Sequence, residues 1–87
     1  MQVQVTGRHM DVTESLREYS EEKITRAAKL VNGDKATAEV RLRVEKNPSI
    51  ENPQVAEVTI HLGGRVIRAQ EAASDMYAAI DLAADKI

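Results

Sequence analysis

The sequence predicts an α+β fold, a two-layer sandwich in which a four-stranded mixed sheet carries two helices on one face. Four segments alternate apolar and polar residues, as half-buried strands do. Two further segments repeat apolar residues at helical spacing, and the order is strand, helix, strand, strand, strand, helix. Every strand has one polar face, so helices are needed on only one side of the sheet. The architecture is similar to that of double-stranded RNA-binding domains, an analogy of fold alone.

The length and composition of the chain indicate one small domain, residues 1–87, with a net charge of −2. Hydrophobic residues make up 43%, which is sufficient for a folded core. The chain has no cysteine, which excludes disulfides and thiolate metal sites. It has neither the roughly 18–20 consecutive apolar residues that cross a bilayer nor a basic, apolar signal peptide at its start. We therefore expect a cytoplasmic protein with no membrane partner.

The first half of the chain begins with a strand over residues 1–6, which Gly7 ends. A helix follows from about Thr13, whose hydroxyl can cap the first turn, to Val31. Asn32-Gly33 is its stop signal, because glycine readily adopts the left-handed conformation of a helix C-cap. The helix has an apolar face at Leu16, Tyr19, Ala27 and Leu30 or Val31. Lys23 lies near that face, and we expect its stem on apolar surface and its ammonium in water.

The second half contains three strands and a helix. A strand over residues 36–46 pairs in parallel with the first through a right-handed crossover, and the proline-containing segment 47–53 is predicted to be the most mobile loop. Residues 54–62 and 65–71 form a hairpin around Gly63-Gly64. Such a turn pairs Leu62 with Arg65, Ile60 with Ile67, and Val58 with Ala69. The last helix, over 74–87, is predicted to use Ser74 as its cap, and to have an apolar face at Met76, Ile80, Ala83 and Ile87, and an opposite, exposed face with Asp81 and Asp85.

No catalytic constellation is visible. His9 and His61 lack the spacing of metal ligands, and Gly63-Gly64 lacks the further glycines of a phosphate-binding loop. The pair Asp81 and Asp85 is explained by an exposed acidic face. We expect no enzyme activity, no catalytic residue, no metal, no cofactor and no small-molecule substrate.

Basic residues form two groups. Lys23, Arg26 and Lys29 are three apart and make a ridge along the first helix, which Arg17 extends. Arg41, Arg43 and Arg68 project from the open sheet face. Each group is either a solvated charged face, with nearby glutamates cancelling part of the helix charge, or a set of phosphate contacts. With two Tyr and no Phe or Trp, the chain lacks stacking aromatics, so any RNA target is expected to be structured RNA bound through its backbone.

Several segments resemble the bacterial ribosome hibernation-promoting factors and the related ribosome-associated inhibitor. These are residues 1–7 (Met-Gln-Val-Gln-Val-Thr-Gly), 12–19 (Val-Thr-Glu-Ser-Leu-Arg-Glu-Tyr), 44–46 (Val-Glu-Lys), Gly63-Gly64 and, most specifically, 75–81 (Asp-Met-Tyr-Ala-Ala-Ile-Asp). The resemblance covers the whole chain and has the same order of strands and helices.

The resemblance implies a non-enzymatic factor that binds the small ribosomal subunit between head and body, over the messenger and transfer RNA sites, when growth slows. Such factors block translation and favour idle, in many cases paired, ribosomes. By position, it assigns contacts with ribosomal RNA to Lys23, Arg26 and Lys29, with Arg17 behind them; Lys86 would start a basic tract, and Arg41, Arg43 and Arg68 are weaker candidates. Short members continue the last helix with Lys and Arg, whereas long members add a linker and a dimerising domain.

We therefore expect the N-terminal domain of a long member, whose full-length form homodimerises through a C-terminal domain. The alternative from a different class is a protein-interaction module that uses an exposed edge or the polar face of the sheet.

Overall fold

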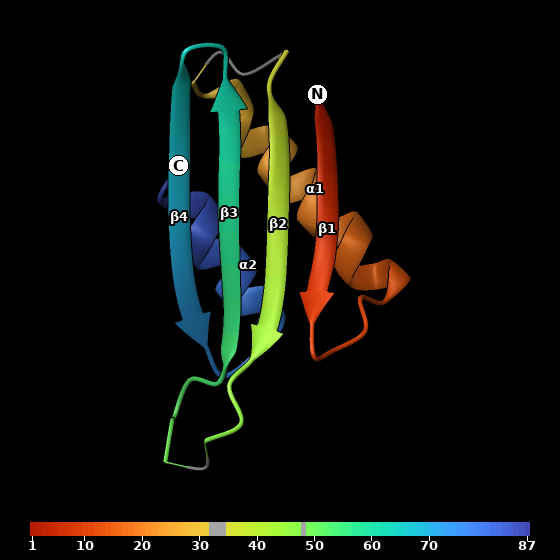
Figure 1. Ribbon diagram of the computed structural model, residues 1–87, viewed down its shortest axis with the longest axis vertical. Coiled ribbons are helices and arrows are strands. Elements are labelled where there is room, and N and C mark those ends of the chain that lie inside the picture. Colours follow the sequence, from red (N-terminus) through yellow and green to blue (C-terminus); the bar gives the residue numbers. More distant parts are fainter. Residues whose placement is uncertain (32–34, 48) are drawn as a thin grey trace.

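The structure, a computed structural model, describes residues 1–31, 35–47 and 49–87. The order of elements is as predicted: β1 (Gln2–Arg8), α1 (Glu14–Lys29), β2 (Thr37–Val44), β3 (Gln54–Leu62), β4 (Arg65–Ala73) and α2 (Met76–Asp85). The strands form one sheet in the order β1-β2-β3-β4, in which β1 is parallel to β2 and the other neighbours are antiparallel. Both helices lie on the same face of the sheet (Figure 1). The predicted two-layer α+β sandwich is confirmed.

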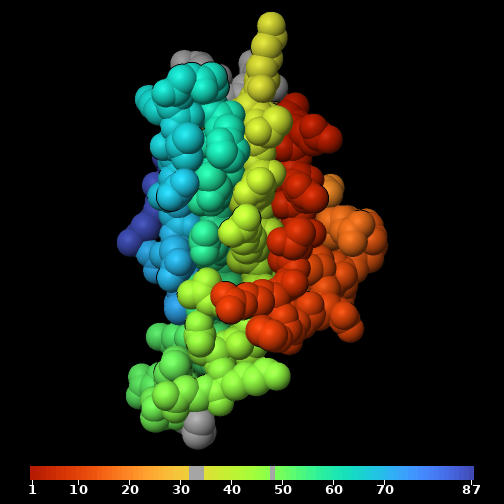
Figure 2. Space-filling model, viewed as in Figure 1, coloured from red at the N-terminus to blue at the C-terminus, as the bar shows by residue number. Residues whose placement is uncertain are grey.

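The core lies between the sheet and the helices. The alternation in the central strands sends Val40, Leu42, Val58 and Ile60 to the helix side, where all four are fully buried. α2 packs on β3 and β4, and α1 packs on β1 and on α2. Among the fully buried residues, each helix contributes an isoleucine, Ile24 from α1 and Ile80 from α2. The opposite face of the sheet is left open, and side chains of all four strands form its surface (Figure 2).

The hairpin between β3 and β4 has the predicted register. Leu62 pairs with Arg65, Ile60 with Ile67, and Val58 with Ala69. Gly63 has a φ of 55°, a conformation that a two-residue turn requires and that glycine adopts without a steric penalty. The two-residue turn therefore sets which residues of β4 join the core.

The start of α2 differs from the prediction. β4 continues to Ala73, which pairs with Gln54, so the strand occupies two residues more than expected. The cap is consequently Asp75 rather than Ser74, and its carboxylate accepts a hydrogen bond of 3.2 Å from the backbone N–H of Ala78. A carboxylate at this position also interacts favourably with the positive end of the helix dipole.

β1 also runs further than predicted. Gly7 lies within the strand rather than ending it, and Arg8 still pairs with Arg43 of β2. A Cβ on Gly7 would lie 2.5 Å from the carbonyl oxygen of Met10, so the chain after β1 folds back closely over this position. His9 makes the turn with a φ of 58°. Glycine at this position allows the backbone of the following residues to approach the strand closely. The sequence pattern alone suggested instead that Gly7 marks the end of the strand.

α1 begins as predicted, because the Thr13 hydroxyl accepts a hydrogen bond of 3.1 Å from the N–H of Leu16. The helix ends at Lys29, and Leu30 is 85% exposed whereas Val31 is partly buried. Of the two alternatives for the end of the apolar face, Leu30 or Val31, the structure therefore favours Val31. The predicted stop at Asn32-Gly33 lies outside the described residues. So does Pro48 in the loop between β2 and β3, and the mobility of that loop stays a prediction.

Candidate nucleic-acid interface

The four basic residues of α1 differ in how far they are neutralised. Arg17 and Lys29 are exposed and form no ion pair with any residue that the structure describes. Arg26 has a side chain that is 69% exposed, and it pairs with Glu22 one turn earlier at 2.7 Å. Exposed pairs of this kind contribute little, about 0.3–0.5 kcal/mol, so a phosphate readily replaces the carboxylate. Three of the four predicted helix cations are therefore accessible to an anionic partner.

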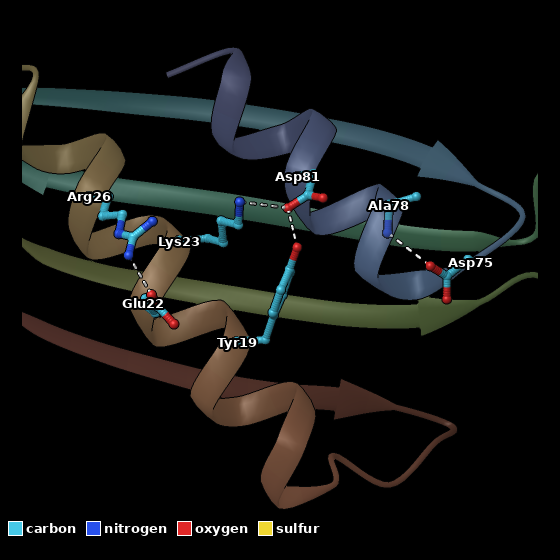
Figure 3. A network of polar contacts seen from close by, with 7 residues as sticks. All are labelled: Tyr19, Glu22, Lys23, Arg26, Asp75, Ala78 and Asp81. Atoms are coloured by element: carbon cyan, nitrogen blue, oxygen red, sulfur yellow. Dashed lines mark hydrogen bonds and ion pairs between the residues drawn. The ribbon is translucent and has the colours of Figure 1, made fainter.

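Lys23 lies between the two helices. Its ammonium is 3.4 Å from Oδ1 of Asp81 on α2, and the Tyr19 hydroxyl donates a hydrogen bond of 2.6 Å to the same oxygen (Figure 3). The ammonium also lies 5.6 Å from the centroid of the Tyr19 ring, within the range of a cation–π contact. The side chain of Lys23 is 37% exposed, so its ammonium keeps contact with water, as expected, but it also has a carboxylate partner on α2 that the sequence did not predict.

Asp81 was predicted to share an exposed acidic face with Asp85, and this is wrong for Asp81. Asp85 is exposed, whereas Asp81 is partly buried and faces α1. The physical reason is that α1 lies beside α2 and packs on it, so a residue that points away from the apolar stripe of α2 meets the neighbouring helix. A helical pattern shows which side faces the sheet but not which side faces another helix.

Tyr19 belongs to the same contact network. Its ring lies edge-on to the ring of Tyr77 in α2, with centroids 4.9 Å apart and an interplanar angle of 83°. The hydrogen bond to Asp81, followed by burial and the negative charges of Asp81, Asp75 and Glu22, raises the pKa of Tyr19 to about 12. One hydroxyl and two rings therefore connect the helices next to Lys23.

This raised pKa predicts a dependence of stability on alkaline pH. The folded state holds the Tyr19 proton more tightly than the unfolded chain does, where the pKa is 10.0. The contribution to stability is thus complete below pH 10 and is lost as the pH rises through 10 toward 12. Unfolding in urea at a series of alkaline pH values should show the difference between wild type and Tyr19→Phe shrinking over this range. A constant difference would contradict the assignment.

Arginines form a second group on the open face of the sheet. Arg41 lies 3.6 Å from Glu39, and Arg43 lies 2.9 Å from Glu45 and 3.6 Å from Glu57, so these two predicted contacts are partly neutralised. Arg68 is exposed and makes no ion pair within the described part of the chain.

Arg8 belongs to this group and was missed. It pairs in register with Arg43, and Arg8, Arg41, Arg43 and Glu57 are among the residues that line a hollow of about 130 Å³. The prediction ended the first strand at Gly7, so Arg8 was assigned to a connector. The parallel register of β1 and β2 would have identified it.

Lys86 lies apart from the α1 cations. It is the C-cap of α2 and pairs with Glu71 of β4, at the other edge of the sheet from β1. The structure thus places the predicted residues in three locations, namely α1 (Arg17, Lys23, Arg26 and Lys29), the open sheet face (Arg41, Arg43 and Arg68) and the β4 edge (Lys86). Within the described residues, no group of three or more His, Asp or Glu side chains is arranged to hold a metal ion, and no helix is long and apolar enough to cross a bilayer.

The known proteins whose sequences are similar to this chain have similar names. The chain is 40% identical over 87 residues to a ribosome hibernation promotion factor of Picosynechococcus sp., which covers all of this chain and 45% of that protein. A ribosome hibernation promoting factor of Azotobacter vinelandii is 43% identical over 88 residues, covering 100% and 76% of the two chains. The ribosome hibernation promotion factor of Deinococcus radiodurans is 44% identical over 83 residues, which cover 94% of this chain and 42% of that protein. The chain thus spans less than half the length of the first and third of these relatives.

Solved structures agree on the fold. The crystal structure of the Thermus thermophilus Protein Y N-terminal domain has a TM-score of 0.80 and 31% identity, covering 98% of this chain and 89% of that one. A ribosomal subunit interface protein from Coxiella burnetii has a TM-score of 0.82 and 26% identity, covering 99% and 88%. Residues 3–87 match the model of a single family over nearly the whole chain. The chain therefore belongs to the family described as Sigma 54 modulation protein / S30EA ribosomal protein.

Proposed function

We propose that this domain binds the small ribosomal subunit through the phosphate backbone of ribosomal RNA. It occupies the messenger and transfer RNA sites, inhibits translation, and promotes inactive, paired ribosomes in stationary phase or stress. The observation that carries the proposal is that three cations of α1 are exposed and either unpaired within the described residues or held by one weak surface pair, namely Arg17, Arg26 and Lys29. Relatives over this same stretch are named ribosome hibernation promotion factors.

The chemistry of these side chains suits phosphate better than bases. Long cationic side chains on a helix neutralise phosphates and release counterions, which provides affinity without reading sequence. The open sheet face adds Arg8 and Arg68, and the partly neutralised Arg41 and Arg43, as further contacts, while Lys23 and Lys86 contribute only when their carboxylate partners are displaced. The two tyrosines contact each other and leave few aromatic faces for stacking on bases.

The domain acts, in this proposal, as the ribosome-binding part of a longer cytoplasmic protein. Two of the relatives are more than twice as long as the part that matches, since the matched stretch covers 45% and 42% of them. We infer a linker and a C-terminal dimerisation domain in the full-length protein, which would bring two ribosomes together. The proposed action is stoichiometric binding without chemistry, so the domain is not an enzyme.

Co-sedimentation with vacant small ribosomal subunits across a salt series tests this function. We expect binding at low salt that weakens steeply as salt rises, with log K falling by about 0.7–0.9 per phosphate contact for each tenfold increase in salt. A protein-interaction module that uses the edge of β1 or β4 would instead bind a protein with little dependence on salt and no need for RNA. Binding that salt does not affect, or no binding at low salt, would reject the RNA-backbone proposal.

A further inference from the structure

Lys23 is the one predicted cation of α1 that another helix neutralises. Its partner Asp81 comes from α2, 58 positions later in the chain, whereas the partner of Arg26 lies one turn away on α1 itself. The side chains of Lys23 and Asp81 are 37% and 42% exposed, so an RNA phosphate can approach the pair from solvent. Any phosphate that approaches Lys23 therefore meets a carboxylate already in place.

The carboxylate of Asp81 is held on this site by more than the lysine. The Tyr19 hydroxyl donates a hydrogen bond of 2.6 Å to the same Oδ1 (Figure 3). The Tyr19 ring is itself packed edge-on against Tyr77 of α2. A surface carboxylate with one partner can rotate away from an incoming anion. This one would have to give up its hydrogen bond with Tyr19, or remain and repel the phosphate.

We propose that Asp81 competes with RNA phosphate for Lys23 and thereby limits the affinity of the domain for ribosomal RNA. The inference rests on the proposed function and adds an affinity-determining residue to it. In the wild type, Lys23 is neutralised internally and releases few counterions from RNA. Removing the charge of Asp81 turns Lys23 into one additional phosphate contact.

Asp81→Asn is the variant that isolates this effect, because the amide oxygen still accepts the hydrogen bond of Tyr19 while the negative charge is lost. Asp85→Asn is the matched control, since Asp85 lies on the same helix, is exposed, and forms no ion pair in the described part of the chain. Both variants raise the net charge by one. Any effect of overall charge is therefore common to the two.

The measurement is binding to vacant small ribosomal subunits over a salt series. We expect Asp81→Asn to bind more tightly at low salt and to steepen the slope of log K against log salt by about 0.7–0.9, the value for one phosphate contact. Asp85→Asn should leave the slope at the wild-type value. In a Lys23→Gln background the effect of Asp81→Asn on the slope should disappear, because there is no ammonium that the loss of the Asp81 charge could make available to a phosphate.

A second comparison remains informative if circular dichroism shows that Asp81→Asn does not fold. Lys23→Gln in the wild-type background should change the slope by less than half as much as Lys29→Gln, whose ammonium has no partner among the described residues. Equal changes would overturn the inference, and so would equal slopes for Asp81→Asn and Asp85→Asn. Both of those results leave the proposed function standing, whereas absence of binding by the wild type at low salt would overturn the two proposals together.

Discussion

Replacing Arg26 and Lys29 together by glutamate is expected to weaken binding to small ribosomal subunits by roughly 100-fold or more at about 0.1 M salt. Each phosphate contact contributes to the binding constant a factor that varies as the salt concentration to the power of about −0.9. At about 0.1 M salt this factor is close to tenfold, so each lost contact weakens binding by about that much. The glutamates add repulsion toward phosphate. The slope of log K against log salt should become shallower by the amount that two phosphate contacts contribute, about 1.4–1.8. Co-sedimentation over a salt series measures both the affinity and this slope.

The fold should survive this double substitution. Both side chains are exposed, and the substitutions remove one surface pair and place negative charge near the C-terminus of α1, each costing about 1 kcal/mol or less. Far-UV circular dichroism and urea unfolding check this. Lys46→Glu with Arg65→Glu is the matched control, because it makes the same change in net charge at two other exposed residues. If the control loses as much affinity as the α1 variant, binding depends on net charge and not on the surface of α1.

Ile80→Ala is expected to lower the free energy of unfolding by about 2–5 kcal/mol, the usual cost of deleting a buried aliphatic side chain and leaving a cavity. Ile80 is fully buried in α2, the helix that covers β3 and β4. Small domains are commonly stable by only about 5–15 kcal/mol, so the variant should be partly unfolded in mild urea. Equilibrium unfolding in urea, followed by circular dichroism, gives the difference.

Leu82→Ala is the control for Ile80→Ala on the same helix. Leu82 is 43% exposed, and alanine is the better helix former, so we expect a change of only about 0.5 kcal/mol. If the two variants lose equal stability, α2 does not present the face to the sheet that the structure describes. The same experiment therefore tests the orientation of the helix that carries Asp81.

Local patterns were sufficient to predict most of the fold. The spacing of Val40, Leu42, Val58 and Ile60 identified the buried face of the central strands, because successive side chains of a strand point to opposite faces. The hairpin register followed from Gly63-Gly64, since a two-residue turn allows one pairing of the strands beside it. Errors at element ends, at Gly7 and at Ser74, arose where a tertiary contact or a sheet ladder extended a strand beyond its pattern.

The candidate interface was predictable only in part. The sequence showed that Arg26 and Lys29 lie next to each other on one helix, because residues three apart are neighbours on a helix surface, whereas Arg17 lies on the opposite side of the helix from Arg26. It did not reveal Arg8, whose place beside Arg43 depends on the register of two parallel strands joined through α1. No short turn sets that register, so it is decided by how α1 packs.

By itself, the sequence determined the order of the elements, the face that each of them buries, and the family to which the chain belongs. The tertiary structure alone decided which polar and charged side chains meet, as Asp81 does with Tyr19 and Lys23, and Lys86 with Glu71. The reason is physical. Burial follows from hydrophobic periodicity within one element, whereas the partner of a charged side chain depends on the neighbouring element that packing brings to it.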